Sequence, residues 1–416
     1  MRCLHLIHRY WPARGGSEKF FIEISERLAA DGNSVTIFTT DAIDIQHYWL
    51  PGKERIDKPR EDHNGVDVRR FNVKRLPKHA QALRVLGKIP GLGPRSLFSF
   101  PSPLVPGMLA QIFSRERFDI VHATALPYDS ILYTAYEIAK RQQIPLVYSP
   151  FFHLGEEGVE DVRKFYTRPH QMRLVKSADK VTVQTSIERD FLSSSGFPEE
   201  KMLLLGMGIN PWELEGGKAD SFRSKYDIAG PVVCCIGPKT YDKGTFHLVE
   251  AMERLWSGGD PATLVLAGID IEDFRRYHAK LPENVKSKCI MLDFIPEEDK
   301  LDMLDACSLL VLPSRSDSFG IVFLEAWFYG KPVVWALAGG IPGLVRDGVD
   351  GLLVPFADVK ELALSIQKLL LDKEYARGLG QAGRDRVLAE FTWDEKYAVV
   401  KGLYEELTGT AGGAGR

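Results

Sequence analysis

The chain has 416 residues and a formal net charge of −3 at pH 7, with 44% of its residues apolar and 26% charged. This balance is typical of a soluble globular protein of two or three domains, and it gives no overall charge argument for nucleic-acid binding. The five cysteines show neither metal-ligand spacing nor the density of a disulfide scaffold, so we expect buried thiols in a reducing compartment.

Short β-branched runs alternate with helical patterns from the first residues onward. No opening segment has the order of a signal peptide, and no apolar run reaches the roughly 18 to 20 residues of a membrane helix, so we expect a cytoplasmic protein. The alternation predicts a doubly wound parallel sheet. The strands expected in this first sheet are 2–8, 35–40, 119–124, 145–151 and 180–185.

The same scheme restarts at residue 231, with helices predicted at 296–307 and 359–370. We therefore predict an α/β protein of two Rossmann-like domains that face each other across a cleft, where the ligand should bind. The strands expected in the second sheet are 231–238, 263–269, 289–294, 309–314, 332–337 and 351–355.

Glycine and proline replace hydrophobic periodicity between Gly206 and Asp220, which predicts a linker there. The last helices should pack back toward the N-terminal domain, and the final residues are too small and polar to pack. The predicted divisions are an N-terminal domain 1–205, a linker 206–220, a C-terminal domain 221–385, helices 386–407 and a flexible tail 408–416.

Two glycine-containing loops follow the first strand of each domain. Gly15 and Gly16 precede a helix for which Ser17 is the expected cap, so the loop can approach an anion, although a tight turn alone would look the same. After Gly237, Lys239 and Lys243 are suited to holding a diphosphate, with an ordinary solvated loop as the alternative.

Two carboxylates, Asp317 and Glu325, follow the strand at 309–314, one in a turn and one in a mostly apolar helix. At the carboxyl end of a strand they could hold sugar hydroxyls in the cleft. The alternative is a capping aspartate and a helix glutamate paired with a neighbour. Since its helix is apolar, Glu325 needs a partner.

The stretches GGSEKFFIEISERLAADGNSVTIFT, DIVHAT, ADKVTVQTS, GMGIN, DKG, SDSFGIVFLEAWFYGKPVV and AGGIPGLVRDGVDGLLV occur in this order. With them, the chain to about residue 407 resembles the retaining glycosyltransferases of family 4, which have the GT-B fold. The resemblance implies that domain 1–205 is the acceptor side and that domain 221–385 binds a nucleotide sugar. The resemblance implies that Glu325 binds the ribose of a nucleotide, while Asp317 and the amides around Phe319 hold the donor sugar. The donor site that it implies is completed by Gly15, Gly16, Gly237, Lys239, Lys243, Ser318, Gly320 and Ile321.

The sequence departs from the family pattern at two positions. Pro238 stands where the family usually has arginine, and our hypothesis is that Lys239 supplies the missing charge, while Lys243 is the family lysine. Asp317 is one methylene shorter than the usual glutamate, which leaves sugar selectivity open.

His122 and His153 both follow predicted strands of the first domain, at the edge that faces the cleft. The family has a functionally important histidine near His153, which we predict to be catalytic together with Asp317, Glu325 and Lys243. His122 is predicted on the acceptor side. A structural, hydrogen-bonded histidine is the alternative for both.

The segment 69–95 contains eight Lys and Arg and no Asp or Glu, interleaved with apolar residues. It is a candidate for peripheral contact with an anionic membrane on the cytoplasmic face, with a solvated loop as the alternative. Without stacking aromatics among the basic residues, nucleic acid is not an expected partner.

Together these features predict transfer of a hexosyl group from a UDP- or GDP-sugar to an acceptor hydroxyl, with retention at the anomeric carbon. The acceptor would be a glycan, a lipid-linked sugar or a small molecule. No D-x-D motif is present, so we expect no metal and no cofactor. A sugar-nucleotide epimerase of the same fold and a non-catalytic sugar-nucleotide sensor are the alternatives.

Overall fold

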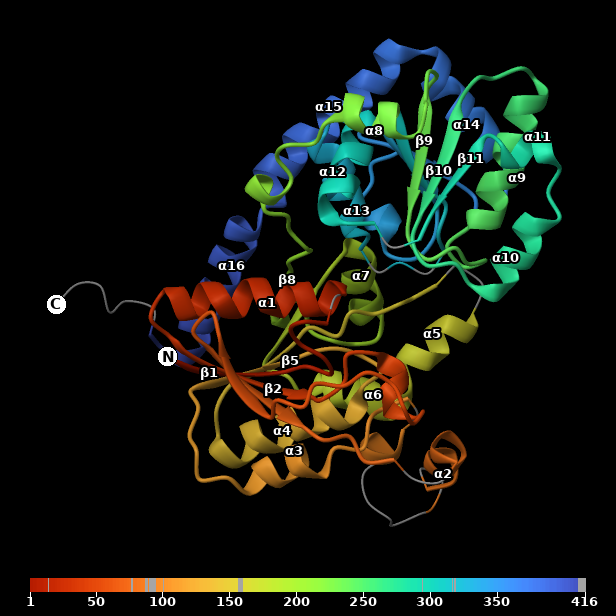
Figure 1. Cartoon of the computed structure of the whole chain (residues 1–416). Helices are drawn as coiled ribbons and strands as arrows, with labels where there is room; N and C mark the ends of the chain where they lie inside the picture. Colours follow the sequence, from red (N-terminus) through yellow and green to blue (C-terminus); the bar gives the residue numbers. More distant parts are fainter. Residues whose placement is uncertain are drawn as a thin grey trace.

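The computed structural model confirms the predicted α/β fold, with two sheets that each belong to a separate domain (Figure 1). The N-terminal domain lies below the C-terminal domain in this view, and the cleft between them contains the carboxyl ends of strands from both sheets. The structure describes residues 1–13, 15–75, 78–86, 89, 95–99, 101–155, 160–293, 295–315, 317 and 319–410.

The N-terminal sheet has the strand order β3-β4-β2-β1-β5-β6-β7-β8, and only β3 runs antiparallel to its neighbour. All five predicted strands are present. The sequence pattern of apolar runs did not predict β3, β4 or β8. β3 consists of polar residues, and β8 has only three residues. The strands are β1 Arg2–Leu6, β2 Ser34–Thr40, β3 Arg60–His63, β4 Val66–Phe71, β5 Ile120–Ala123, β6 Leu146–Tyr148, β7 Lys180–Val183 and β8 Met202–Leu204.

Helices cover both faces of this sheet. The first helix, α1, packs on one face, while α3, α4 and α6 lie on the other side of the sheet in Figure 1. A separate apolar cluster, which includes Leu132, Ile138 and Leu174, packs between the sheet and the helices on this second side. The helices are α1 Gly16–Ala30, α2 His79–Leu86, α3 Pro106–Ala110, α4 Asp129–Gln142, α5 Glu160–Tyr166, α6 Pro169–Lys176 and α7 Ser186–Ser194, with 3-10 turns η1 Ile45–Tyr48, η2 Arg95–Phe98, η3 Gln111–Phe113 and η4 Glu199–Lys201.

The C-terminal sheet is entirely parallel, in the order β11-β10-β9-β12-β13-β14, and all six predicted strands are present. Because helices cover both faces, its strands are continuous apolar runs such as LLVL in β12. The strands are β9 Val232–Ile236, β10 Thr263–Ala267, β11 Cys289–Leu292, β12 Leu309–Leu312, β13 Val333–Ala336 and β14 Leu352–Val354. The remaining elements are η5 Pro211–Glu213, α8 Ala219–Lys225, α9 Thr245–Ser257, α10 Glu272–Ala279, α11 Glu283–Lys286, α12 Glu297–Ala306, α13 Ile321–Phe328, η6 Ile341–Gly343, α14 Val359–Leu371, α15 Lys373–Glu390 and α16 Trp393–Thr408.

The last helix, α16, packs against α1 and β5 of the N-terminal domain (Figure 1). The hydroxyl of Tyr404 lies 2.9 Å from Nε2 of His5 and 2.6 Å from Nδ1 of His122, and all three side chains are buried. Backbone pairing of Ile209 with Phe391 and Trp393 holds the linker beside the start of this helix. The C-terminal helix therefore joins the two domains by buried hydrogen bonds as well as by apolar packing.

Candidate active site

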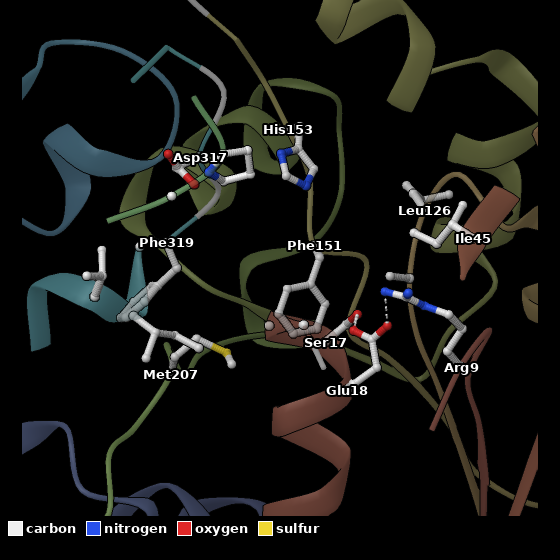
Figure 2. A pocket seen from close by; sticks show the side chains of 18 of the residues that line it. Arg9, Ser17, Glu18, Ile45, Leu126, Phe151, His153, Met207, Asp317 and Phe319 are labelled. Atoms are coloured by element: carbon white, nitrogen blue, oxygen red, sulfur yellow. Dashed lines mark hydrogen bonds and ion pairs between the residues drawn. The ribbon is translucent and has the colours of Figure 1, made fainter. Parts of the chain in front are cut away.

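Loops from both domains enclose a cavity of about 470 Å³ between the two sheets (Figure 2). The loops follow β1, β5 and β6 on the N-terminal side and β9 and β12 on the C-terminal side. This is the edge at which open α/β sheets bind ligands. The predicted site residues that line the cavity are Gly15, Gly16, His153, Gly237, Lys243, Asp317, Phe319, Gly320 and Ile321.

An ion pair lies on the C-terminal wall of the cavity. The ammonium of Lys243 is 2.6 Å from Oδ1 of Asp317, and both side chains are about one fifth exposed. The other carboxylate oxygen, Oδ2, is buried and has no hydrogen-bond partner among the residues that the structure describes. The pair therefore offers a ligand one fixed positive charge and one unused acceptor oxygen.

Glycines allow the backbone to bring these groups together. Gly244 has a φ of 70°, and a Cβ there would lie 2.2 Å from the carbonyl oxygen of Pro313, so only glycine lets the Lys243 loop pack on the end of β12. Gly320 has a φ of 80° and caps α13, where a Cβ would lie 2.8 Å from Trp335. The start of α13 borders the cavity, and α9 begins directly after the loop that contains Lys243.

On the opposite wall, the loop after β1 leads into α1. Gly15, and not Ser17 as predicted, is the residue that precedes the helix. The Glu18 carboxylate folds back over this loop, and a Cβ at Gly15 would lie 2.4 Å from its Oε2. The hydroxyl of Ser17 donates to the same oxygen over 2.9 Å.

Glu18 holds a second ion pair, with Arg9, that the sequence reasoning missed (Figure 2). Its Oε1 is 2.6 Å from Arg9 and 3.3 Å from Nε2 of His8, and the Glu18 side chain is only 2% exposed. Burial disfavours the carboxylate, but His8 and Arg9 outweigh it and hold the Glu18 pKa at about 2. Burial lowers the pKa of His8 despite Glu18, so this wall carries a nearly neutral, polar surface.

Apolar side chains flank the polar groups of this N-terminal wall. Ile45 and Leu126 line the cavity beside Arg9, and the ring of Tyr128 stacks on His8 with centroids 3.9 Å apart. Figure 2 shows Arg9 on the side of the cavity away from Asp317. The one signal that could have identified Arg9 is its position just after the first strand, at the carboxyl edge of the sheet.

His153 lines the cavity from the loop after β6, and its ring lies 4.8 Å from the ring of Tyr166. The same loop contacts the other domain, because the amide of Gly339 donates to the carbonyl of Gly155 over 2.9 Å. His153 is thus placed at the junction of the two walls, where Figure 2 shows it beside Asp317.

Lys239 does not face the cavity, contrary to the hypothesis that it replaces the family arginine. Its ammonium lies 2.7 Å from Asp270 and donates to the carbonyls of Gly268 and Leu292, and the residue is 1% exposed. The loops after β10 and β11 use all of its donors. Lys239 is a structural residue of the C-terminal domain.

Glu325 is placed on α13 but does not line the cavity that contains Lys243. Its Oε1 accepts from Lys300 of α12 over 3.0 Å, and its side chain is 16% exposed. Burial raises the Glu325 pKa, and Lys300 partly opposes this effect. The predicted need for a partner is thus met by Lys300, and a contact with ribose stays a prediction.

His122 is also away from the cavity, so its assignment to the acceptor side is wrong. The residue is fully buried between Tyr404 and Ser149, whose hydroxyl is 2.7 Å from Nε2. Burial, together with the nearby His5, lowers the pKa of His122 well below its usual value. His5 of β1 and Tyr404 of α16 contact its ring, and His122 is not among the described residues that line the cavity. Ser318 lies outside the described residues.

The predicted membrane segment 69–95 is described only in part, since 76–77, 87–88 and 90–94 lie outside the described residues. Val85 at the end of α2 is 61% exposed. None of the helices in the described ranges is long and apolar enough to cross a membrane. Within the same ranges, no group of three His, Cys, Asp or Glu side chains is arranged to hold a metal.

Comparison with known proteins matches both halves of the chain to family models. Residues 15–208 match the glycosyl transferase 4-like domain, and residues 219–386 match glycosyl transferases group 1. An uncharacterised glycosyltransferase of Methanocaldococcus jannaschii is 28% identical to this chain. The aligned region covers 53% of this chain and 57% of that protein. The D-inositol 3-phosphate glycosyltransferase of Geodermatophilus obscurus is 24% identical, over 91% of this chain and 82% of its own length.

Among solved structures, the chain is similar to HepE of Anabaena in complex with UDP and glucose. The TM-score is 0.72 over 98% of this chain and all of that one, at 18% sequence identity. A likeness at this identity concerns the fold, in which two domains enclose a cleft.

Proposed function

Because the chain belongs to the family 4-like glycosyltransferases of the GT-B fold, we propose that it transfers a hexosyl group from a nucleotide diphosphate sugar to an acceptor hydroxyl. The observation that carries this proposal is the Lys243–Asp317 pair, which faces the first turn of α1 across one cavity. A donor diphosphate and its sugar would occupy the space between them.

The leaving nucleoside diphosphate develops negative charge as the bond to the sugar breaks. Lys243 provides a fixed ammonium, and the amides at the starts of α1 and α13 border the same cavity. Fixed donors of this kind stabilise developing charge without reorganisation, and helix N-termini favour anions. The residues described here can therefore assist departure of the diphosphate through their own charges and amides.

Asp317 is better suited to binding the donor sugar than to attacking it. One of its oxygens is held by Lys243 at 2.6 Å, which stabilises the carboxylate and reduces its nucleophilicity. Its free Oδ2 can accept a hydrogen bond from a sugar hydroxyl. Retention would then follow from attack of the acceptor on the face from which the diphosphate leaves, in a cleft that excludes water.

The N-terminal wall is the acceptor side in this proposal. Arg9 and Glu18 offer a donor and an acceptor to a hydroxyl-bearing ring, and Ile45 and Tyr128 provide apolar surface beside them. This assignment replaces the one made for His122. His153, at the junction of the walls, is placed to contact both substrates.

Two similar proteins support the donor class. HepE was crystallised with UDP and glucose. A GDP-mannose-dependent mannosyltransferase of Mycobacterium tuberculosis is 27% identical to this chain, and the alignment covers 60% of that protein. Both UDP and GDP sugars therefore stay in the proposal. Contact of segment 69–95 with a membrane has no support from these similarities.

Donor binding is tested by thermal shift with UDP, GDP, UDP-glucose and GDP-mannose, since a bound ligand raises the melting temperature by mass action. Lys243→Met should weaken binding of the stabilising nucleotide about 10- to 100-fold, the value of a hydrogen bond to a charged group. Lys280→Met, at the exposed end of α10, is the matched control and should bind normally. Equal affinity in the two variants would contradict the assignment of Lys243.

Transfer is tested by incubating the stabilising donor with a panel of glycosides and following the anomeric signals by NMR. An α-linked product from an α-linked donor is expected. An altered sugar nucleotide formed without acceptor would instead establish an epimerase. Binding with neither transfer nor hydrolysis would favour a sensor, and binding of none of the four nucleotides would refute the proposal.

A further inference from the structure

A second cavity, of about 240 Å³, lies in the N-terminal domain between α4, α6 and η2. It shares no described lining residue with the cleft between the domains. Two helices that contribute to its lining, α4 and α6, lie on the side of the sheet opposite α1 in Figure 1. Its described lining residues are Arg95, Ser96, Tyr133, Tyr136, His170, Arg173, Leu174 and Ser177.

The charges around this cavity are unbalanced. Its described lining contains Arg95 and Arg173 and no Asp or Glu. Neither guanidinium makes a hydrogen bond or an ion pair with any part of the chain that the structure describes. In contrast, Arg168 on the same side of the domain donates to Ser99, and its guanidinium lies over the ring of Phe165. Two like charges that border one cavity favour an anion between them, and guanidinium groups bind phosphate oxygens in pairs.

His170 is held at the cavity by a buried carboxylate. Its Nε2 lies 2.8 Å from Oδ2 of Asp129, which is completely buried and also accepts from Gln171 over 3.0 Å. Nε2 further lies 3.2 Å from the hydroxyl of Ser99. These contacts occupy Nε2 and fix the ring, and no hydrogen bond to the other nitrogen, Nδ1, comes from the residues that the structure describes.

Two tyrosines complete the wall. Tyr133 and Tyr136 lie one turn apart on α4, and Lys140 lies 5.4 Å from the ring of Tyr136, which adds positive charge nearby. Burial, with the neighbouring Glu137, raises the pKa of Tyr133, so its hydroxyl stays protonated and can donate. Glu137 lies on the same helix and is the negative charge that would oppose binding of an anion from this side.

From these observations we propose that the second cavity is a binding site for a phosphate group. Arg95 and Arg173 would hold the phosphate oxygens, and the tyrosines would contact the group that carries the phosphate. Because Nε2–H of His170 already donates to Asp129, His170 would donate to the phosphate from Nδ1 as the imidazolium. The cavity volume fits a phosphate with a small attached group. The site stands independently of the donor assignment, since it shares no lining residue with the cleft.

The position of the site connects it to the acceptor wall. Tyr128 lines the cleft, and the next residue, Asp129, holds His170 at the second cavity. The start of α4 therefore contacts both. The phosphate could belong to a free phosphorylated molecule or to a lipid, and the shared chemistry is a phosphate anion.

The test is isothermal titration of the full chain with inorganic phosphate, pyrophosphate and glycerol 3-phosphate at low ionic strength. Saturable binding with a stoichiometry near one is expected. The double variant Arg95→Gln and Arg173→Gln should lose at least tenfold in affinity. The matched control is Arg115→Gln with Arg117→Gln, two exposed arginines of the same domain and the same change in charge, which should bind like the wild type.

Equal loss in both double variants would show diffuse charge attraction and overturn the proposal, as would the absence of saturable binding in the wild type. Thermal unfolding and nucleotide binding should be unchanged in the Arg95 and Arg173 variant, which checks the fold. Sedimentation with phosphatidic acid or phosphatidylcholine vesicles separates the two sources. Binding to phosphatidic acid that the variant loses indicates a lipid phosphate, and binding of soluble phosphates alone indicates a free molecule.

Discussion

Replacing Lys300 by methionine tests how much the positive charge of Lys300 stabilises the Glu325 carboxylate on α13. The ammonium of Lys300 lies 3.0 Å from Glu325 and 2.5 Å from Glu297, and the Lys300 and Glu325 side chains are 17% and 16% exposed. Methionine keeps most of the length of the stem and removes only the charge. The substitution leaves a largely buried carboxylate beside a second one.

The expected loss follows from the geometry. At 3.0 Å and an effective dielectric constant of about 20, the attraction is about 5.5 kcal/mol. Glu325 can escape this loss by taking up a proton, which at pH 7 costs about 3.5 kcal/mol for a carboxyl of ordinary pKa. We therefore expect the free energy of unfolding at pH 7 to fall by about 2 to 3.5 kcal/mol.

The sign of the pH dependence is also fixed. Burial already raises the Glu325 pKa, and the loss of Lys300 should raise it further. A folded carboxyl with a raised pKa binds more protons than the unfolded one, so stability falls as pH rises above the ordinary pKa. The difference between Lys300→Met and wild type should therefore be small at pH 5 and large at pH 8.

Urea denaturation followed by tryptophan fluorescence, at pH 5, 6, 7 and 8, measures this difference. Lys300→Arg keeps the charge and should stay within about 1 kcal/mol of wild type, and Glu297→Gln tests the more exposed partner, which should matter little. A loss in Lys300→Met that is equal at all four pH values would refute the reasoning, because lost packing does not depend on protonation.

Four further changes have defined outcomes. Lys239→Met should lower stability by about 3 kcal/mol in urea, since it strips Asp270 and two carbonyls of a buried partner, while UDP or GDP affinity by titration stays within twofold. Gly244→Ala should cost about 1 to 3 kcal/mol in the same assay, because its φ is 70°. Glu18, with a pKa of about 2, should contribute about 3 kcal/mol that is lost as pH falls from 5 to 2, a slope that Glu18→Gln should flatten. Tyr404→Phe should remove one of the two hydrogen-bond partners of His5 and of His122 and speed hydrogen exchange throughout α16. For each of the four changes, values equal to those of the wild type would contradict the argument.

The sheets were predictable from sequence because buried parallel strands are continuous apolar runs of fixed length. Every strand expected from such a run is present, and the missed β3 consists of Arg60–His63, which has no apolar residue. The turn Asn64–Gly65 that follows is a hairpin signal that could have revealed it. Strands that are buried on both faces could therefore be predicted from their apolar sequence alone.

The two loop lysines show why the site was only partly predictable. Lys239 and Lys243 lie four residues apart in one loop, and both suit a diphosphate by local chemistry. Lys239 is buried because Asp270, which follows β10, pairs with it, whereas Lys243 meets Asp317 at the cavity. Each partner is distant in sequence, so only the tertiary fold shows that Lys239 is structural and that Lys243 lines the cavity.

The distribution of charge in the cleft determines where an anionic substrate can bind. The C-terminal wall presents Lys243 to a diphosphate, whereas on the N-terminal wall Glu18 neutralises Arg9 at 2.6 Å. A second anion in the cleft would meet that carboxylate and lose affinity. The second cavity differs in this respect, because its described lining contains Arg95 and Arg173 and no carboxylate that would oppose an anion.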